Sequence, residues 1–276
     1  MRTFPYARLR IGTIHSLHSL YSLTPHTCQR HCARHAQNNG ARVSILRPSC
    51  YNRTTQHIGG DGIDTPRWIL WDWNGTLYND VAVCIAAMNG MRAERGIAPP
   101  LDADSYRRIF GFPVSAYYLR AGLRFEEESF EALAAIFMAR YHAASAQCGL
   151  HEGAASALRA LQARGIRQVL LSASKTEHLA RQLEPFGIAS CFDSILGLDD
   201  FYANSKLTIA ENWARAHRVD ARDVLCIGDT THDFEVAQAL GCACLLVASG
   251  HQSREVLSRC GCPVVTDLRA AAAWLG

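Results

Sequence analysis

The 276-residue chain lacks an apolar run long enough to cross a lipid bilayer, and it has no cysteine pair with the two-residue gap typical of zinc sites. Its eleven cysteines are odd in number and scattered. The closest pairs, Cys242 with Cys244 and Cys260 with Cys262, are separated by a single residue. We therefore expect no membrane segment and no disulfide framework, and we predict reduced, largely buried thiols in a cytoplasmic protein.

Lysine is almost absent. Apart from Lys175 and Lys206, every basic residue other than histidine is an arginine. Lys206 stands at the start of a predicted helix, next to a predicted strand end. A lysine at such a place indicates a need for a compact point charge rather than the planar fork of a guanidinium group.

Acidic residues are missing from residues 1–60, which contain eight Arg and six His without a clear apolar period. An organellar transit peptide is one interpretation, and a metal site among His26, Cys28, His31, Cys32 and His35 is another. Our preferred hypothesis is that residues 1–66 form a disordered or non-native N-terminal extension. Because that segment carries a charge of +6 and the remainder −3, we expect no nucleic-acid binding by the body of the chain.

The body begins with a short apolar strand at residues 68–71. Helical patterns follow at residues 81–95, 102–110, 116–120 and 125–147, and they form an all-helical insertion. From residue 149 onward, predicted helices alternate with short apolar strands. This order predicts an α/β fold with a doubly wound parallel sheet, a Rossmann-like core formed by residues 67–80 and 149–276, and a helical unit at 81–148.

Polar side chains stand at four of the predicted strand ends, and the carboxyl ends of parallel strands meet at one edge of a sheet. Two carboxylates four residues apart in a strand-to-helix turn can face one oxygen-ligated cation such as Mg²⁺. Hydroxyl and ammonium donors at neighbouring ends can hold an anion. The residues concerned are Asp72, Ser172, Lys206, Asp229 and Asp233.

With these polar residues in this order along the sequence, the chain resembles the haloacid dehalogenase-like hydrolases. The four motifs of that family match Asp72-Trp73-Asn74-Gly75-Thr76, then Ser172, then Lys206, then Gly228-Asp229 with Asp233. The resemblance covers residues 67–276. The helical insertion at 81–148 looks like the family's small C1-type cap, and Gly111-Phe112-Pro113 looks like a loop of its phosphoglycolate phosphatase-like members.

The resemblance implies a phosphatase-type enzyme that hydrolyses small phosphomonoesters, with Mg²⁺ as cofactor and a small phosphorylated metabolite as partner. Asp72 would be the nucleophile that forms an aspartyl-phosphate. Ser172 and Lys206 would hold the phosphoryl oxygens. The implied metal ligands are Asp72, the backbone carbonyl of Asn74, Asp229 and Asp233, and the implied substrate contacts also include Thr76, Gly111 and Phe112.

Asn74 departs from the family pattern, in which this position is a second Asp that protonates the leaving oxygen. An amide cannot titrate, and a general acid of this kind contributes about 10²–10⁴-fold. An alternative is therefore a weakly active or inactive member that binds phosphorylated ligands, or one with a phosphonate- or dehalogenase-type activity. On the sequence alone, Asn74→Asp is expected to restore the missing acid.

Overall fold

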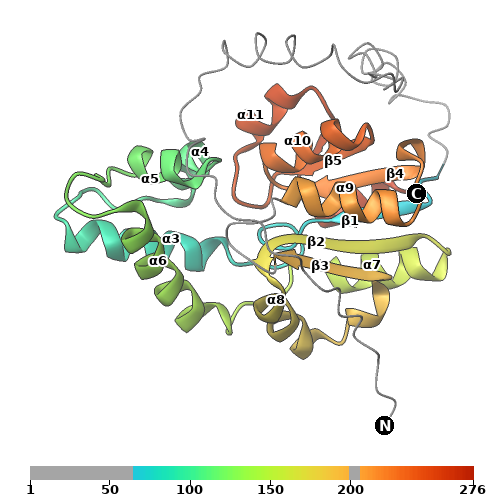
Figure 1. Cartoon of the computed structure of the whole chain (residues 1–276), viewed down its shortest axis with the longest axis horizontal. Coiled ribbons are helices and arrows are strands. Elements are labelled where there is room, and N and C mark those ends of the chain that lie inside the picture. Colours follow the sequence, from blue (N-terminus) through green and yellow to red (C-terminus); the bar gives the residue numbers. More distant parts are fainter. Residues whose placement is uncertain (1–64, 199–205) are drawn as a thin grey trace, which may run out of the picture. The chain divides into compact units, whose positions relative to one another are not determined.

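The computed structural model of the chain describes residues 65–198 and 206–276 (Figure 1). The hypotheses about the N-terminal extension, including its histidine and cysteine cluster, therefore lie almost wholly outside the described residues.

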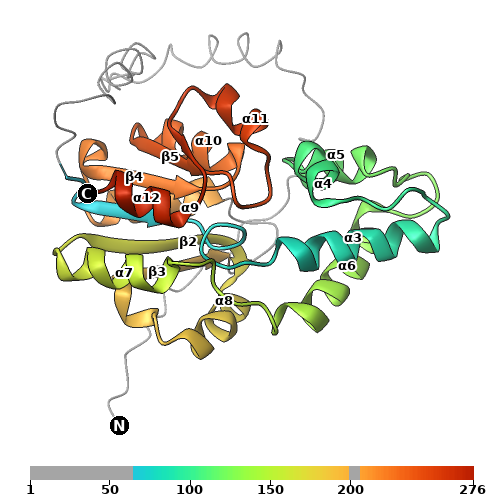
Figure 2. The same cartoon turned by 180° about the vertical axis from the view of Figure 1, so that it is seen from behind.

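Six parallel strands form one sheet in the order β3-β2-β1-β4-β5-β6 (Figures 1 and 2). β1 lies between β2 and β4. Along the chain, β2 and β3 are added on one side of β1, and β4, β5 and β6 are then added on its other side. The strand order thus reverses between β1 and β4, which is where ligands of open α/β sheets bind. The strands are β1 (Trp68–Trp71), β2 (Arg167–Lys175), β3 (Ser194–Leu198), β4 (Val224–Gly228), β5 (Ala243–Val247) and β6 (Val264–Val265).

Helices cover both faces of this sheet. Along β1, Ile69 and Trp71 enter one apolar core while Trp68 and Leu70 enter the other, as the alternation of side chains along a strand requires. The first core is closed by α7 (Ala154–Ala163), α8 (Thr176–Leu183) and α12 (Leu268–Trp274). The second is closed by α9 (Lys206–Ala216), α10 (Thr231–Leu240) and α11 (Arg254–Leu257). The predicted α/β class is confirmed.

Four helices lie between β1 and α7 in the chain and surround a third apolar cluster, with α3 packed against α6 (Figure 2). The side chain of Asp102 accepts a hydrogen bond from the backbone N of Ser105 at 2.7 Å and so caps α4, as the sequence suggests. The four helices are α3 (Val81–Glu94), α4 (Ala103–Ile109), α5 (Val114–Arg120) and α6 (Phe130–Ser145).

The helix predicted at residues 125–147 begins five residues later, at Phe130. The hydroxyl of Ser129 accepts a bond from the backbone N of Ala132 at 3.2 Å, so the helix is capped there. The three glutamates expected in its first turn precede it instead. One of them, Glu128, contacts Arg95, at the end of α3.

The strand predicted to end at Ser172 continues to Lys175. Its register with β3 shifts between Leu171 and Lys175, and the hydroxyl of Ser172 accepts a bond from the backbone N of Ser174 at 3.0 Å. Ser172 therefore lies within an irregular strand end rather than in the turn to the next helix, and Ser174 lies on the same edge.

None of the helices in residues 65–198 and 206–276 combines the length and the apolar composition needed to cross a membrane. The eight cysteines within these ranges are all free thiols, and Cys242 and Cys244 are buried, as expected. Cys260 and Cys262 are only partly buried.

Candidate active site

Two of the three carboxylates expected to bind a metal follow neighbouring strands. Asp72 comes directly after β1, where its backbone N donates to the carbonyl oxygen of Ile227 in β4 at 2.9 Å. Asp229 comes directly after β4. Because β1 and β4 pair in parallel at the point where the strand order reverses, both side chains lie at the same edge of the sheet.

Thr76 lies between these two carboxylates. Its hydroxyl oxygen is 3.0 Å from Oδ2 of Asp72 and 2.8 Å from Oδ1 of Asp229, and the residue is fully buried. A hydroxyl has one hydrogen to donate, so Thr76 can satisfy only one of the two at a time. The geometry thus gives Thr76, expected as a substrate contact, a bridging position within the carboxylate cluster.

Lys206, at the first residue of α9, is buried with its ammonium group between Asp72 and Asp233. Its Nζ contacts Oδ1 of Asp72 and lies 2.5 Å from Oδ1 of Asp233. Burial acts to lower the pKa of Lys206, but the two adjacent carboxylates outweigh it and raise that pKa. The compact ammonium group of a lysine fits this narrow gap better than the broader guanidinium group of an arginine would.

Asp233 is held from several sides. Its Oδ2 accepts bonds from the backbone N of Asp229 at 3.2 Å and from the backbone N and hydroxyl of Thr230 at 3.0 and 2.8 Å. Its Oδ1 faces Lys206. Burial acts to raise the pKa of Asp233, yet Lys206 outweighs burial and lowers it. Both oxygens therefore have partners, and the residue caps α10 and orients its neighbours.

The carboxylates of Asp72, Asp229 and Asp233 offer ligand atoms that all lie within 4.8 Å of one another. Burial raises the pKa of Asp229, with His251 opposing and Asp233 adding to the rise. Burial likewise raises the pKa of Asp72, against the opposing charge of Lys206. Buried carboxylates with a single ammonium group among them favour a further cation, and an all-oxygen ligand set fits Mg²⁺.

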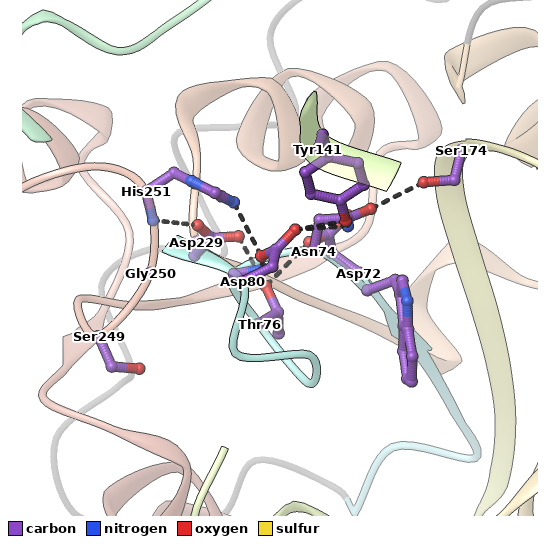
Figure 3. A network of polar contacts seen from close by, with 12 residues as sticks. Asp72, Asn74, Thr76, Asp80, Tyr141, Ser174, Asp229, Ser249, Gly250 and His251 are labelled. Atoms are coloured by element: carbon purple, nitrogen blue, oxygen red, sulfur yellow. Dashed lines mark hydrogen bonds and ion pairs between the residues drawn. The ribbon is translucent and has the colours of Figure 1, made fainter. Parts of the chain in front are cut away.

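Asn74 points its amide nitrogen toward Asp80 and its amide oxygen toward Ser174 (Figure 3). The Nδ2 lies 2.8 Å from Oδ2 of Asp80 and 2.8 Å from the hydroxyl of Tyr141. The Oδ1 accepts from the hydroxyl of Ser174 at 2.9 Å and from that of Ser172 at 3.5 Å. The structure thus brings Ser172 to Asn74 and adds Ser174 beside it.

Three buried residues of this site were missed by the sequence analysis: Asp80, Tyr141 and His251. His251 Nε2 lies 3.3 Å from Oδ1 of Asp80, and its backbone N donates to Oδ2 of Asp229 at 2.6 Å (Figure 3). Burial acts to lower the pKa of His251, but Asp80 outweighs it and raises that pKa to about 9. The same pairing lowers the pKa of Asp80 despite its burial.

A signal for Asp80 was available, since it is an acidic residue six positions after Asn74 and directly before a predicted helix. Tyr141 lies on α6 and His251 follows β5, so neither has a local pattern that connects it with the first strand. Only the packing of distant segments brings Tyr141 to Asn74 and His251 to Asp80.

The loop at residues 111–113 lies beside the start of α10. The ring of Phe112 is 4.7 Å from that of His232, and Phe112 is 39% exposed. Gly111 has no side chain and so leaves room for Gln252. A β-carbon on residue 111 would lie 3.1 Å from Nε2 of Gln252. The contacts described for Phe112 are with His232 and Phe110 rather than with Asp72.

Direct hydrogen bonds join the helical insertion to the core. Arg107 of α4 donates to the carbonyl oxygens of Gly250 and Ser249 at 2.9 and 3.1 Å. Gln252 donates to the carbonyl oxygen of Phe110 at 3.0 Å and accepts from the backbone N of Thr231 at 2.7 Å. These bonds connect the insertion with the turn that carries Asp229.

Comparison with known proteins places these features in context. The sequence model of the haloacid dehalogenase-like hydrolase family matches residues 69–247 of this chain. The phosphoglycolate phosphatase of Rhodospirillum rubrum is 29% identical, over 76% of this chain and 91% of that protein. Tyrosine-protein kinase PtkA of Mycobacterium tuberculosis is 27% identical, over 74% of this chain and 69% of that protein.

Solved structures agree at the level of the fold. A haloacid dehalogenase-like hydrolase of Streptococcus pneumoniae superposes with a TM-score of 0.65 at 19% identity. The superposition covers 77% of this chain and all of that one.

Proposed function

This chain belongs to the haloacid dehalogenase-like hydrolase family, and we propose that it is a Mg²⁺-dependent phosphatase of small phosphomonoesters that acts through an aspartyl-phosphate. The similarity to phosphoglycolate phosphatases supports an enzyme of the phosphatase type. We further propose a small phosphorylated metabolite as the substrate and the cytoplasm as the location.

The observation that carries this proposal is the position of Lys206. Its ammonium group contacts the carboxylate of Asp72 at the edge of the sheet where β1 and β4 end. A carboxylate that attacks phosphorus must approach a dianion, which it would otherwise repel. A fixed positive charge beside the attacking oxygen offsets that repulsion and costs no reorganisation during the reaction.

In the proposed reaction an oxygen of Asp72 forms a bond to phosphorus while the ester bond from phosphorus to the leaving oxygen breaks. Water then attacks the aspartyl-phosphate, which releases inorganic phosphate and regenerates the carboxylate. Lys206 and Ser172 donate hydrogen bonds to the phosphoryl oxygens in both steps. Thr76 holds the attacking carboxylate in place through its hydroxyl.

The residues that would hold Mg²⁺ are Asp72, Asp229 and the backbone carbonyl of Asn74. Asp233 would support them, because its own oxygens already accept bonds from Lys206 and from the turn after β4. When bound, Mg²⁺ would add positive charge against the carboxylates and the phosphoryl group.

We propose that residues 81–148 act as a cap over a core formed by residues 67–80 and 149–276. Gly111 and Phe112 would then contact the substrate from the cap. The hydrogen bonds of Arg107 to Ser249 and Gly250 support this arrangement, because they fasten α4 beside the loop that holds His251.

The test is a phosphate-release screen over a panel of small phosphomonoesters, with and without Mg²⁺. We expect turnover of at least one ester that requires Mg²⁺ and is lost in Asp72→Asn. Acid quenching after a single turnover should trap labelled phosphate on the wild-type chain. Turnover that persists in Asp72→Asn would contradict the nucleophile assignment.

Asn74 favours a second candidate, a weakly active member that binds phosphorylated ligands. Such a protein would form the aspartyl-phosphate in a burst and release little product afterwards. Turnover that continues at a steady rate beyond one equivalent per chain would exclude this candidate. Release of halide, or cleavage of a phosphonate in place of an ester, would point instead to the other activities of the family.

A further inference from the structure

The side chains of Asn74, Asp80 and Tyr141 form a closed triangle of hydrogen bonds (Figure 3). Each of the three edges measures 2.8 Å. The Nδ2 of Asn74 donates to the other two residues, and the hydroxyl of Tyr141 donates to Oδ2 of Asp80. Gln182 donates to the same hydroxyl at 3.1 Å. Since a phenol has one hydrogen and a carboxylate has none, the direction of every bond is fixed.

The two oxygens of Asp80 have different partners. Oδ2 faces the triangle, while Oδ1 accepts from the backbone N of Gly75 at 3.0 Å and lies 3.3 Å from Nε2 of His251. The residue is 1% exposed. All four groups around it are donors, which is the environment of an ionised carboxylate.

This arrangement determines which side chain suits position 74. An aspartate there would place an oxygen where Nδ2 now stands, 2.8 Å from Oδ2 of Asp80. Two carboxylate oxygens at that distance repel one another unless a proton lies between them, and a proton held there by Asp80 is not free for a leaving oxygen. The expectation that Asn74→Asp alone would restore a general acid is therefore revised.

We infer that Asp80 is a positioning residue for Asn74, and that the two residues form an exchangeable pair in which the network accepts a carboxylate at either position but not at both. The effect of this pairing on catalysis rests on the proposed phosphatase function. The effect of the pairing on stability is independent of that function.

Exchange of the two side chains keeps every bond of the network. With Asn at position 80, Oδ1 still accepts from Gly75 and His251, and Nδ2 takes the place of the former Oδ2. That nitrogen donates to an aspartate at 74 and to Tyr141, whose hydroxyl turns to donate to the same aspartate. The other aspartate oxygen still accepts from Ser174.

The first test is a cycle of unfolding measurements on metal-free protein with Asn74→Asp, Asp80→Asn and the double variant. We expect each single variant to unfold several degrees below the wild type. Asn74→Asp brings two carboxylates together, and Asp80→Asn removes the charge beside His251 and sets two amide nitrogens against each other. The double variant should recover the part of that loss that arises in the triangle, while the loss of the charge beside His251 remains. A double variant whose midpoint falls by the sum of the two single losses would overturn the inference.

The matched control is Asn79→Asp, the same chemical change at an exposed neighbour of Asp80. It should leave the unfolding midpoint close to the wild type. An equal loss in Asn79→Asp and Asn74→Asp would show that the triangle has no part in the effect and would overturn the inference.

The second test compares turnover of an alkyl phosphate by the four proteins of the cycle. With a carboxylate at 74 and no second one beside it, the double variant can take a proton from the attacking water in the second step, so its turnover should exceed that of the wild type by on the order of 10²-fold. A full gain in Asn74→Asp alone, with no further effect of Asp80→Asn, would overturn the pairing. If none of the proteins hydrolyses any ester, the proposed function fails, while the unfolding cycle still decides the pairing.

Discussion

A β-carbon on Gly75 would lie 2.4 Å from Oδ2 of Asp229, which is closer than any side chain tolerates. Gly75 also has a φ of +77°, in the left-handed region. The turn after β1 can thus press its backbone against the carboxylate that follows β4 only because it has no side chain. A β-carbon on Gly250 would lie even closer to the same oxygen, at 2.1 Å.

Gly75→Ala should therefore destabilise the protein and displace Asp229. The matched control is Gly96→Ala, because Gly96 also has a positive φ, at +65°, but a β-carbon there would meet nothing within 4 Å. The control should lose roughly 1–2 kcal/mol from backbone strain alone. We expect a clearly larger loss for Gly75→Ala in denaturant unfolding, and equal losses would mean that the contact with Asp229 costs nothing.

Lys206→Arg should lower kcat by about 10²–10³-fold, the usual effect of removing one well-placed donor. A guanidinium group is too broad for the gap between Asp72 and Asp233, where Nζ lies 2.5 Å from Asp233. Lys175→Arg changes the only other lysine in the same way and should keep most of the activity. Steady-state kinetics of the two variants provide the comparison, and near-wild-type turnover by Lys206→Arg would contradict the role of Lys206.

Asp229→Ala should raise the Mg²⁺ concentration required for activity and reduce the Mg²⁺-induced rise in the unfolding midpoint. The reason is the loss of one ligand from a cluster whose atoms lie within 4.8 Å of one another. Calorimetric titration of Mg²⁺ measures the effect, and Asp104→Ala, at an exposed position of α4, is the control. Unchanged Mg²⁺ affinity in Asp229→Ala would place the metal elsewhere.

The wild-type enzyme should depend steeply on the leaving group. Asn74 cannot donate a proton, so an aryl phosphate with a stable phenolate should turn over faster than an alkyl phosphate. The difference should approach about 10²–10⁴-fold, the usual contribution of a general acid. A series of aryl and alkyl phosphates of graded leaving-group pKa measures it. A flat dependence would mean that another residue supplies the proton.

Stability should depend on pH through His251. Its pKa rises from 6.5 to about 9 on folding, so the folded protein holds this proton more tightly than the unfolded chain. The stabilisation is fully present below pH 6.5 and is lost as the pH rises through about 9. Breaking this buried pair with His251→Gln should cost on the order of 3 kcal/mol at low pH.

Denaturant unfolding of metal-free wild type and His251→Gln over that pH range tests this expectation. The difference in unfolding free energy between the two proteins should shrink as the pH rises toward 9. A difference that stays constant would mean that the proton on His251 has no part in the stability.

The strand-end rule predicted which residues would share one edge of the sheet. Asp72 and Asp229 follow strands that the sequence marks by short apolar runs, and Lys206 begins a helix whose amphipathic pattern is visible. The structure brings all three together, and it confirms the α/β class. Their catalytic roles remain predictions that the variants above test.

The sequence by itself determined the alternation of strands and helices, the insertion after β1 and the order of the polar strand ends, because each depends on patterns within a few residues. The surroundings of Asn74 were decided only by tertiary structure. Tyr141 reaches Asn74 from α6, and His251 reaches Asp80 from the loop after β5, through the packing of segments far apart in the chain. Periodicity describes one segment at a time. The resemblance to the family's motif indicated that an acid is missing at position 74, but no pattern in the sequence indicated that Nδ2 of Asn74 lies 2.8 Å from Oδ2 of Asp80.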